Sequence, residues 1–127
     1  MVRSAVIVMV FALCAAPAFA KTHPTRTEGA AERGVASTYS MKLVGHRTAS
    51  GAKLDAHQFT AAHPSLPLGT KLLVTNRKNG RRVVVTVNDR GPFLKGRIID
   101  LSPAAAAEIG MKRAGLAPVE IRVASER

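Results

Sequence analysis

The sequence contains very few residues of three types: cysteine, tryptophan and tyrosine. Its 127 residues include one cysteine, no tryptophan, one tyrosine and four phenylalanines. One cysteine excludes a disulfide within the chain, so packing and hydrogen bonds alone must stabilise the fold. The scarcity of aromatic side chains also argues against a platform on which single-stranded nucleic acid could stack.

Acidic residues are scarce as well, with 8 aspartates and glutamates against 19 lysines and arginines. The formal net charge of +11 predicts an affinity for anionic polymers. Basic proteins often bind nucleic acid, but the N-terminal segment predicts export away from it. We therefore expect an anionic polymer of the cell envelope, such as peptidoglycan, and no nucleic acid as partner.

The first 20 residues have the features of a secretory signal peptide. Arg3 gives a short basic region, residues 5–16 form an apolar region, and residues 18–20 (AFA) supply small residues for cleavage. Cleavage is predicted after Ala20, which would place the protein in the periplasm or cell envelope. The apolar region is too short for a stable membrane span, and no later segment could form one.

Lipidation at Cys14 is a weaker alternative, because Leu13 stands where a lipobox has Gly, Ala or Ser. Residues 21–127 suffice for one domain with one modest core. Within them, residues 21–33 are polar and lack an apolar period, which predicts a flexible lead. The folded domain is expected over residues 34–124.

Short β-rich runs predict a barrel. Residues 71–76 and 82–87 are rich in β-branched side chains, and Asn79-Gly80 between them favours a type I′ hairpin turn. The second run is apolar at nearly every position, which is typical of a strand buried on both faces. Further strands are expected within residues 34–40, 58–63, 96–100 and 118–123.

One short helix is expected over residues 103–109. Ser102 can cap it, Pro103 suits its first position, and Gly110 suits its end. Short strands with a single small helix predict a mostly β fold.

Five stretches occur in an order that resembles a known family: GVASTYS, RTASG, FTAAHPSLPLGT, VVVTVNDRGPF and GRIIDLSPAAAAEIG. They resemble the catalytic domain of the rare lipoprotein A family of septal-ring lytic transglycosylases, over residues 34–124. The resemblance implies a six-stranded double-psi β-barrel with one short helix. It also implies endolytic cleavage of peptidoglycan strands that lack stem peptides, leaving 1,6-anhydro-N-acetylmuramic acid ends. Division-site proteins are candidate partners of such an enzyme.

The resemblance also implies the catalytic residues. The family's catalytic Asp, in its DRGP motif, matches Asp89, and the His of its AAH motif matches His63. Such an enzyme must protonate the glycosidic oxygen and then accept a proton from the sugar's C6 hydroxyl, which attacks C1. One carboxyl group can perform both steps in turn.

Ala52 departs from the family pattern, in which Glu commonly follows TASG and contributes to activity. This leaves three possibilities: a slower enzyme, support from another acid such as Asp55, or a non-catalytic barrel that binds peptidoglycan as expansins bind their polymers. A further alternative is a glycoside hydrolase that uses Asp89 and Asp100 as two carboxylates.

The residues around Asp89 define the expected site. NDRGPF has the composition of a turn, so its functional role depends on the resemblance. A carboxyl group that donates a proton at neutral pH is usually shielded from water. We therefore expect Asp89 to be half-buried in a groove and Arg90 to point away from it. His63 is expected to orient Asp89 or to hold the muramoyl sugar.

Other substrate contacts are expected from hydroxyl and polar side chains, namely Tyr39, Thr48, Ser50, Asn88 and Arg90. A metal site is not expected, because the spacing of His46, His57 and His63 matches no common metal motif. No glycine-rich phosphate loop is present, so no nucleotide cofactor is expected either.

Overall fold

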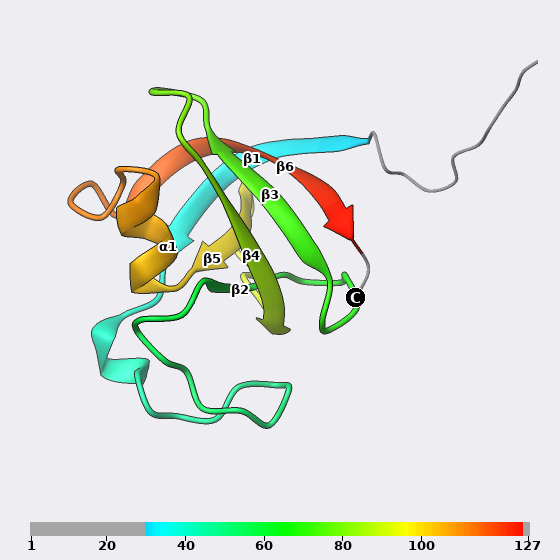
Figure 1. Ribbon diagram of the computed structural model, residues 1–127, viewed down its shortest axis with the longest axis vertical. Helices are drawn as coiled ribbons and strands as arrows, with labels where there is room; N and C mark the ends of the chain where they lie inside the picture. The colour runs from blue at the N-terminus through cyan, green and yellow to red at the C-terminus, as the bar shows by residue number, and fades with distance from the viewer. Residues whose placement is uncertain (1–29, 126–127) are drawn as a thin grey trace, which may run out of the picture.

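Six β-strands close into a barrel in the computed structural model, which describes residues 30–125 (Figure 1). The strands are β1 (Ala31–Thr38), β2 (Thr60–Ala62), β3 (Lys71–Asn76), β4 (Arg82–Asp89), β5 (Arg97–Leu101) and β6 (Leu116–Ser125). A short 3-10 helix, η2 (Met41–Leu43), follows β1, and one α-helix, α1 (Pro103–Glu108), follows β5. The prediction of a mostly β, six-stranded barrel with one short helix is therefore confirmed.

The strands follow the order β1-β5-β2-β4-β3-β6 around the barrel. The pairs β1–β5 and β2–β4 are parallel, and the other four pairs are antiparallel. The parallel pairing places the ends of β1, β2 and β4 close together, because Thr38 lies opposite Leu101 and Ala62 lies opposite Asp89. The candidate site residues that end these strands are thus gathered at one end of the barrel.

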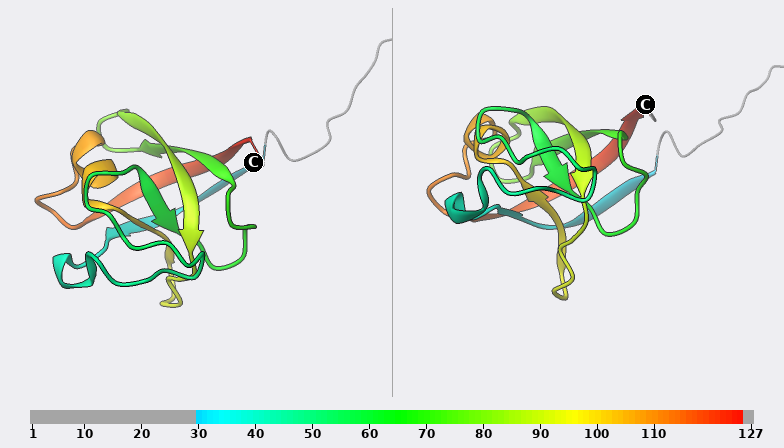
Figure 2. Two further views of the ribbon diagram at one scale, coloured as in Figure 1. Left: turned by 60° about the horizontal axis from the view of Figure 1, so that its bottom comes forward. Right: turned by 90° about the horizontal axis from the view of Figure 1, so that it is seen from below.

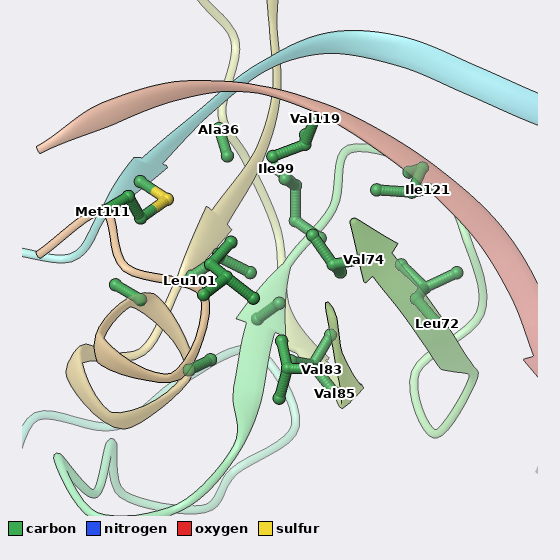
Figure 3. Packing of buried hydrophobic residues seen from close by; sticks show 14 of the residues in the cluster. Ala36, Leu72, Val74, Val83, Val85, Ile99, Leu101, Met111, Val119 and Ile121 are labelled. Atoms are coloured by element: carbon green, nitrogen blue, oxygen red, sulfur yellow. The ribbon is translucent and has the colours of Figure 1, made fainter. Parts of the chain in front are cut away.

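The barrel interior is filled by aliphatic side chains from all six strands and α1 (Figure 3). In β4, Val83, Val85 and Val87 point into this core, whereas Val84 is 45% exposed. The prediction that this strand is buried on both faces was therefore wrong. A closed barrel has a single core, so side chains on the outer face of β4 meet solvent unless another element covers them.

The β3–β4 hairpin is confirmed, but its turn differs from the predicted one. Asn76 N–H donates to the Arg81 carbonyl at 2.8 Å, so the loop contains the four residues 77–80. Gly80 adopts a left-handed φ of 79°, and its N–H donates to the Asn76 carbonyl at 2.7 Å. Side-chain amides decide the longer loop, since those of Asn76 and Asn79 both donate to the Ile109 carbonyl at the end of α1.

Helix α1 begins where the sequence predicts. Ser102 is its N-cap, Pro103 is its first residue, and Gly110 follows it with a φ of 74°. The buried Ser102 hydroxyl donates to the Gln58 carbonyl at 2.6 Å and accepts from the Thr60 N–H at 3.2 Å. The cap therefore also fixes the segment that leads into β2.

The barrel begins earlier than predicted. Residues 31–33 were assigned to the flexible lead, but they form the first part of β1 and pair with residues 120–122 of β6. All three residues are exposed and two of them, Glu32 and Arg33, are charged, which is why their pattern resembled a lead. The predicted signal peptide and residues 21–29 lie outside the described residues. Within residues 30–125 no helix is long and apolar enough to cross a membrane.

Candidate functional site

Asp89 is the last residue of β4, and three hydrogen bonds hold its carboxyl group. Oδ2 accepts from the Tyr39 hydroxyl at 2.8 Å, and Oδ1 accepts from the N–H groups of Ala49 and Arg90, each at 2.8 Å. Tyr39 directly follows β1, and Ala49 lies in the loop over residues 44–59, which crosses this end of the barrel (Figure 2). Segments 40 and 50 residues away in sequence thus fix the orientation of one carboxyl group.

Asp89 is half-buried and lines a pocket, as expected. This Asp89 pocket has a volume of about 80 Å³, and its walls are Tyr39, Leu43, His46, Arg47, Thr48, Leu54 and Asp89. Two basic side chains, His46 and Arg47, therefore share the pocket with one carboxyl group. Such a pocket combines a group that can exchange a proton with groups that can bind an anion.

Arg90 points away from the carboxyl group of Asp89, as expected. Its Nη1 donates to the carbonyls of His63 and Leu66, at 3.2 and 2.7 Å. These bonds tie the end of β4 to the loop that follows β2. The Arg90 side chain therefore helps to hold β4 against this loop.

The His63 ring is buried and points into a different pocket. Its Nδ1 accepts from the N–H groups of Ser65 and Leu66, both at 3.1 Å, and its Nε2 lies 3.3 Å from Oε1 of Glu32. Since Nδ1 accepts, the proton resides on Nε2 and is donated to Glu32. The link to Asp89 is through the backbone, where His63 N–H donates to the Asp89 carbonyl at 3.1 Å.

This His63 pocket has a volume of about 280 Å³ and a mostly apolar wall, contributed by Ala30, Ala31, Glu32, His63, Ser65, Leu66, Leu72, Ile121 and Val123. It is the larger of the two pockets, but Asp89 does not line it. The candidate acid therefore lies in the smaller of these two pockets.

The other expected contact residues also gather near Asp89. Thr48 and Ser50 share a hydrogen bond of 2.9 Å between their hydroxyls, and Ser50 N–H donates to the Asn88 carbonyl at 3.1 Å. The side-chain Oδ1 of Asn88 is buried without a hydrogen-bond partner among the described residues. Of Thr48, Ser50 and Asn88, only Thr48 lines the Asp89 pocket.

Asp100, the alternative second carboxylate, lies on β5 and accepts a hydrogen bond from the Ser37 hydroxyl of the paired strand β1. The negative charge of Asp100 contributes to the raised pKa of Tyr39. Burial raises the pKa of Tyr39 well above its usual value, and the hydrogen bond and charge of Asp89, followed by the charge of Asp100, raise it further. The Tyr39 hydroxyl consequently stays protonated and remains a donor to Asp89.

A first prediction follows from this pKa shift. Tyr39 is the only tyrosine and the chain has no tryptophan, so phenolate absorbance reports Tyr39 alone. We expect its titration well above the free-tyrosine value of about 10. Because the unfolded chain releases this proton near pH 10 and the folded chain retains it, the free energy of unfolding should fall as the pH rises above about 10.

Two variants serve as controls for this titration. Asp89→Asn should lower the pKa of Tyr39 while leaving it above the free value, since burial is unchanged. Tyr39→Phe should show a smaller loss of stability at alkaline pH than the unmodified protein. A titration at the free-tyrosine value in the folded protein would contradict the arrangement around Asp89.

Sequence reasoning missed two partners in this region. Glu32 was assigned to the flexible lead, and Ala49 contributes only its backbone N–H. No side-chain pattern could reveal a backbone donor. Among residues 30–125, no cluster of three or more His, Cys, Asp or Glu side chains could hold a metal ion. Asp55, which the sequence suggested as a supporting acid, accepts a hydrogen bond from the His57 N–H at 2.7 Å.

The family model described as "Lytic transglycolase" matches residues 31–121. The chain belongs to this family. Among curated members, Endolytic peptidoglycan transglycosylase RlpA of Pasteurella multocida is 52% identical over 95 residues, which cover 75% of this chain and 32% of that protein. The resemblance to the rare lipoprotein A family is thereby confirmed. The chain spans about a third of the length of this lytic transglycosylase relative.

Two solved structures are similar in fold to this chain. Streptomyces papain inhibitor has a TM-score of 0.61 and 27% identity, covering 75% of this chain and 94% of its own. An expansin of Clavibacter michiganensis has a TM-score of 0.60 and 26% identity, covering 77% of this chain and 52% of its own. Together with the family match, these likenesses confirm the expected double-psi β-barrel.

Proposed function

We propose that this protein is an exported lytic transglycosylase that cleaves peptidoglycan glycan strands with Asp89 as its acid and base. The observation that carries the proposal is the carboxyl group of Asp89, held by three hydrogen bonds in the wall of a pocket. Family membership and the name of the Pasteurella relative support the reaction type.

The hydrogen bonds indicate which oxygen exchanges the proton. Oδ1 accepts two N–H groups, whereas Oδ2 accepts only the Tyr39 hydroxyl. Oδ2 therefore retains more capacity for a substrate atom. In the proposed mechanism, the Asp89 carboxyl group protonates the glycosidic oxygen as its bond to C1 breaks. The C6 hydroxyl then attacks C1 and returns its proton to Asp89, so no water is consumed.

His63 is proposed to position Asp89 rather than to touch the reacting atoms. Its backbone N–H bonds to the Asp89 carbonyl, and its ring fixes the N–H groups of Ser65 and Leu66. The carbonyls of His63 and Leu66 in turn hold Arg90, the residue after Asp89. Loss of the imidazole would thus loosen the end of β4.

The charge of the Asp89 pocket supports a preference for strands without stem peptides. Removal of the peptide leaves a free lactyl carboxylate on each N-acetylmuramic acid, and an intact peptide masks it as an amide. His46 and Arg47 in the pocket wall are suited to bind such an anion. Action at the division site, together with partners there, remains part of the same proposal.

A non-catalytic, peptidoglycan-binding barrel is the second candidate. Ala52 and the likeness to an expansin favour it. Ala52 is exposed in the 44–59 loop, and its carbonyl accepts from the Thr48 hydroxyl at 2.9 Å. A two-carboxylate hydrolase receives less support, because Asp100 lines neither the Asp89 pocket nor the His63 pocket.

Product analysis separates these functions. The chain from Lys21 onward, incubated with glycan strands freed of stem peptides, should release fragments that end in 1,6-anhydro-N-acetylmuramic acid, as read by mass spectrometry. Reducing ends in place of anhydro ends would indicate a hydrolase. Strands retained by the protein without any cleavage would indicate a binding barrel and would contradict the proposed activity.

A further inference from the structure

A cluster of basic side chains lies at the end of the barrel opposite Asp89. Four of its members come from the β3–β4 hairpin and two from the loop that follows α1: Arg77, Lys78, Arg81, Arg82, Lys112 and Arg113. All six are exposed. Strand β4 joins the two ends, running from Arg82 in this basic cluster to Asp89 in the pocket (Figure 1).

The tertiary structure brings these two segments together. The Asn79 amide donates to the Ile109 carbonyl at 3.1 Å. A Cβ atom placed on Gly110 would lie 2.9 Å from Nη1 of Arg81, so the Arg81 guanidinium covers Gly110. Lys112 and Arg113 follow two and three residues later, in the loop that leads from α1 to β6 (Figure 1). Basic residues 30 or more positions apart in sequence thus lie at the same end of the barrel.

This basic cluster has little internal compensation. None of its six side chains makes a salt bridge among the described residues, whereas Arg33 and Arg122 both pair with Glu120 elsewhere. The acidic residue nearest in sequence is Glu108, on α1. Keeping six like charges together costs free energy through repulsion, and a bound anionic partner would offset that cost.

The shape of the basic cluster indicates the kind of partner. The cluster sits on protruding loops, and none of its residues lines the Asp89 pocket or the His63 pocket. Exposed basic side chains outside both pockets suit a flat array of negative charges better than a single ligand enclosed by the protein. We propose that this end of the barrel adsorbs to a surface of anionic phospholipid headgroups.

Adsorption through the basic cluster leaves the candidate site free. Strand β4 has eight residues, which separates its ends by about 25 Å. The Asp89 pocket would therefore face away from the lipid, toward polymer in the space beyond it. This second site is independent of catalysis, so it stands or falls separately from the proposed function.

Vesicle sedimentation tests the adsorption. The chain from Lys21 onward keeps every residue that the structure describes and omits the apolar leader. We expect it to sediment with phosphatidylglycerol-containing vesicles and not with phosphatidylcholine vesicles. Each basic residue near such a surface strengthens binding by about fivefold at low salt, and binding should weaken as salt rises.

Two variants with equal change in net charge provide the decisive comparison. One neutralises the basic cluster with Lys78→Gln, Arg81→Gln, Lys112→Gln and Arg113→Gln. The other makes four exposed changes outside it, namely Lys42→Gln, Lys53→Gln, Lys71→Gln and Lys95→Gln. We expect the first variant to bind anionic vesicles on the order of 100- to 1,000-fold more weakly, and the second to lose much less.

Several results would overturn the proposal. Equal losses in the two variants would mean that overall charge, and not this cluster, governs binding. Equal sedimentation with both vesicle types, or none with either, would also contradict it. Displacement of the unmodified protein from vesicles by soluble stem-peptide-free glycan, together with weaker glycan binding by the first variant than by the second, would assign the cluster to polymer instead of lipid.

Discussion

Asp89→Asn is expected to abolish strand cleavage while leaving the barrel folded. A positioned general acid or base contributes about 10²- to 10⁴-fold, and here one carboxyl group performs both steps, so the rate of anhydro-product formation should fall by at least about 10³-fold. The asparagine keeps the size of the side chain and one oxygen that can accept the N–H groups of Ala49 and Arg90. Timed product analysis on stem-peptide-free strands measures the loss.

Glu108→Gln is the matched control, because it makes the same type of carboxyl-to-amide change at an exposed position on α1. It should retain the full rate. Circular dichroism and the Tyr39 titration would show that the Asp89→Asn protein is folded around the altered site. Cleavage by Asp89→Asn within a few-fold of the unmodified rate would remove Asp89 from the mechanism.

Leu101→Ala is expected to lower the free energy of unfolding strongly. Leu101 is fully buried in the barrel core (Figure 3), and its carbonyl accepts the Tyr39 N–H at 3.0 Å. Truncation of a buried leucine costs about 2–5 kcal/mol. The total free energy of unfolding of a small domain is only about 5–15 kcal/mol. This domain also has no internal disulfide to restrict the conformations of the unfolded chain. Denaturant unfolding followed by circular dichroism gives the difference.

Leu94→Ala provides the comparison, since it removes the same atoms from a side chain that is 61% exposed in the loop between β4 and β5. Its free energy of unfolding should change by no more than about 0.5 kcal/mol. If the two variants lost stability to the same extent, the core assignment of Leu101 would be wrong. A Leu101 effect well below 2 kcal/mol would mean that the core collapses to fill the cavity.

The local signals in the sequence were strong wherever short-range chemistry decides the structure. Ser102, Pro103 and Gly110 predicted helix α1, because capping and backbone conformation are properties of a few adjacent residues. The run from Lys71 to Asn76 predicted β3 with its observed bounds. The ordered stretches around AAH, DRGP and IIDLS predicted the family and the barrel.

Signals that depend on neighbours far along the chain were misread. The polar residues 31–33 resembled a lead, but pairing with β6 makes them a strand. Val84 resembled a buried residue, but the single core of a barrel leaves it exposed. The turn after Asn76 lengthened because its side chain bonds to Ile109, which lies 33 residues away.

The sequence by itself determined helix α1, the approximate positions of the strands, the family, and the candidate status of Asp89, because these depend on residue types and their order. Only the tertiary structure decided what surrounds Asp89 and where the charges gather. Pairing of β1 with β5, of β5 with β2 and of β2 with β4 brings Tyr39 to Asp89, and the 44–59 loop adds the Ala49 N–H. Hydrogen bonds to a backbone N–H, and contacts between loops distant in sequence, exist only after the barrel has closed.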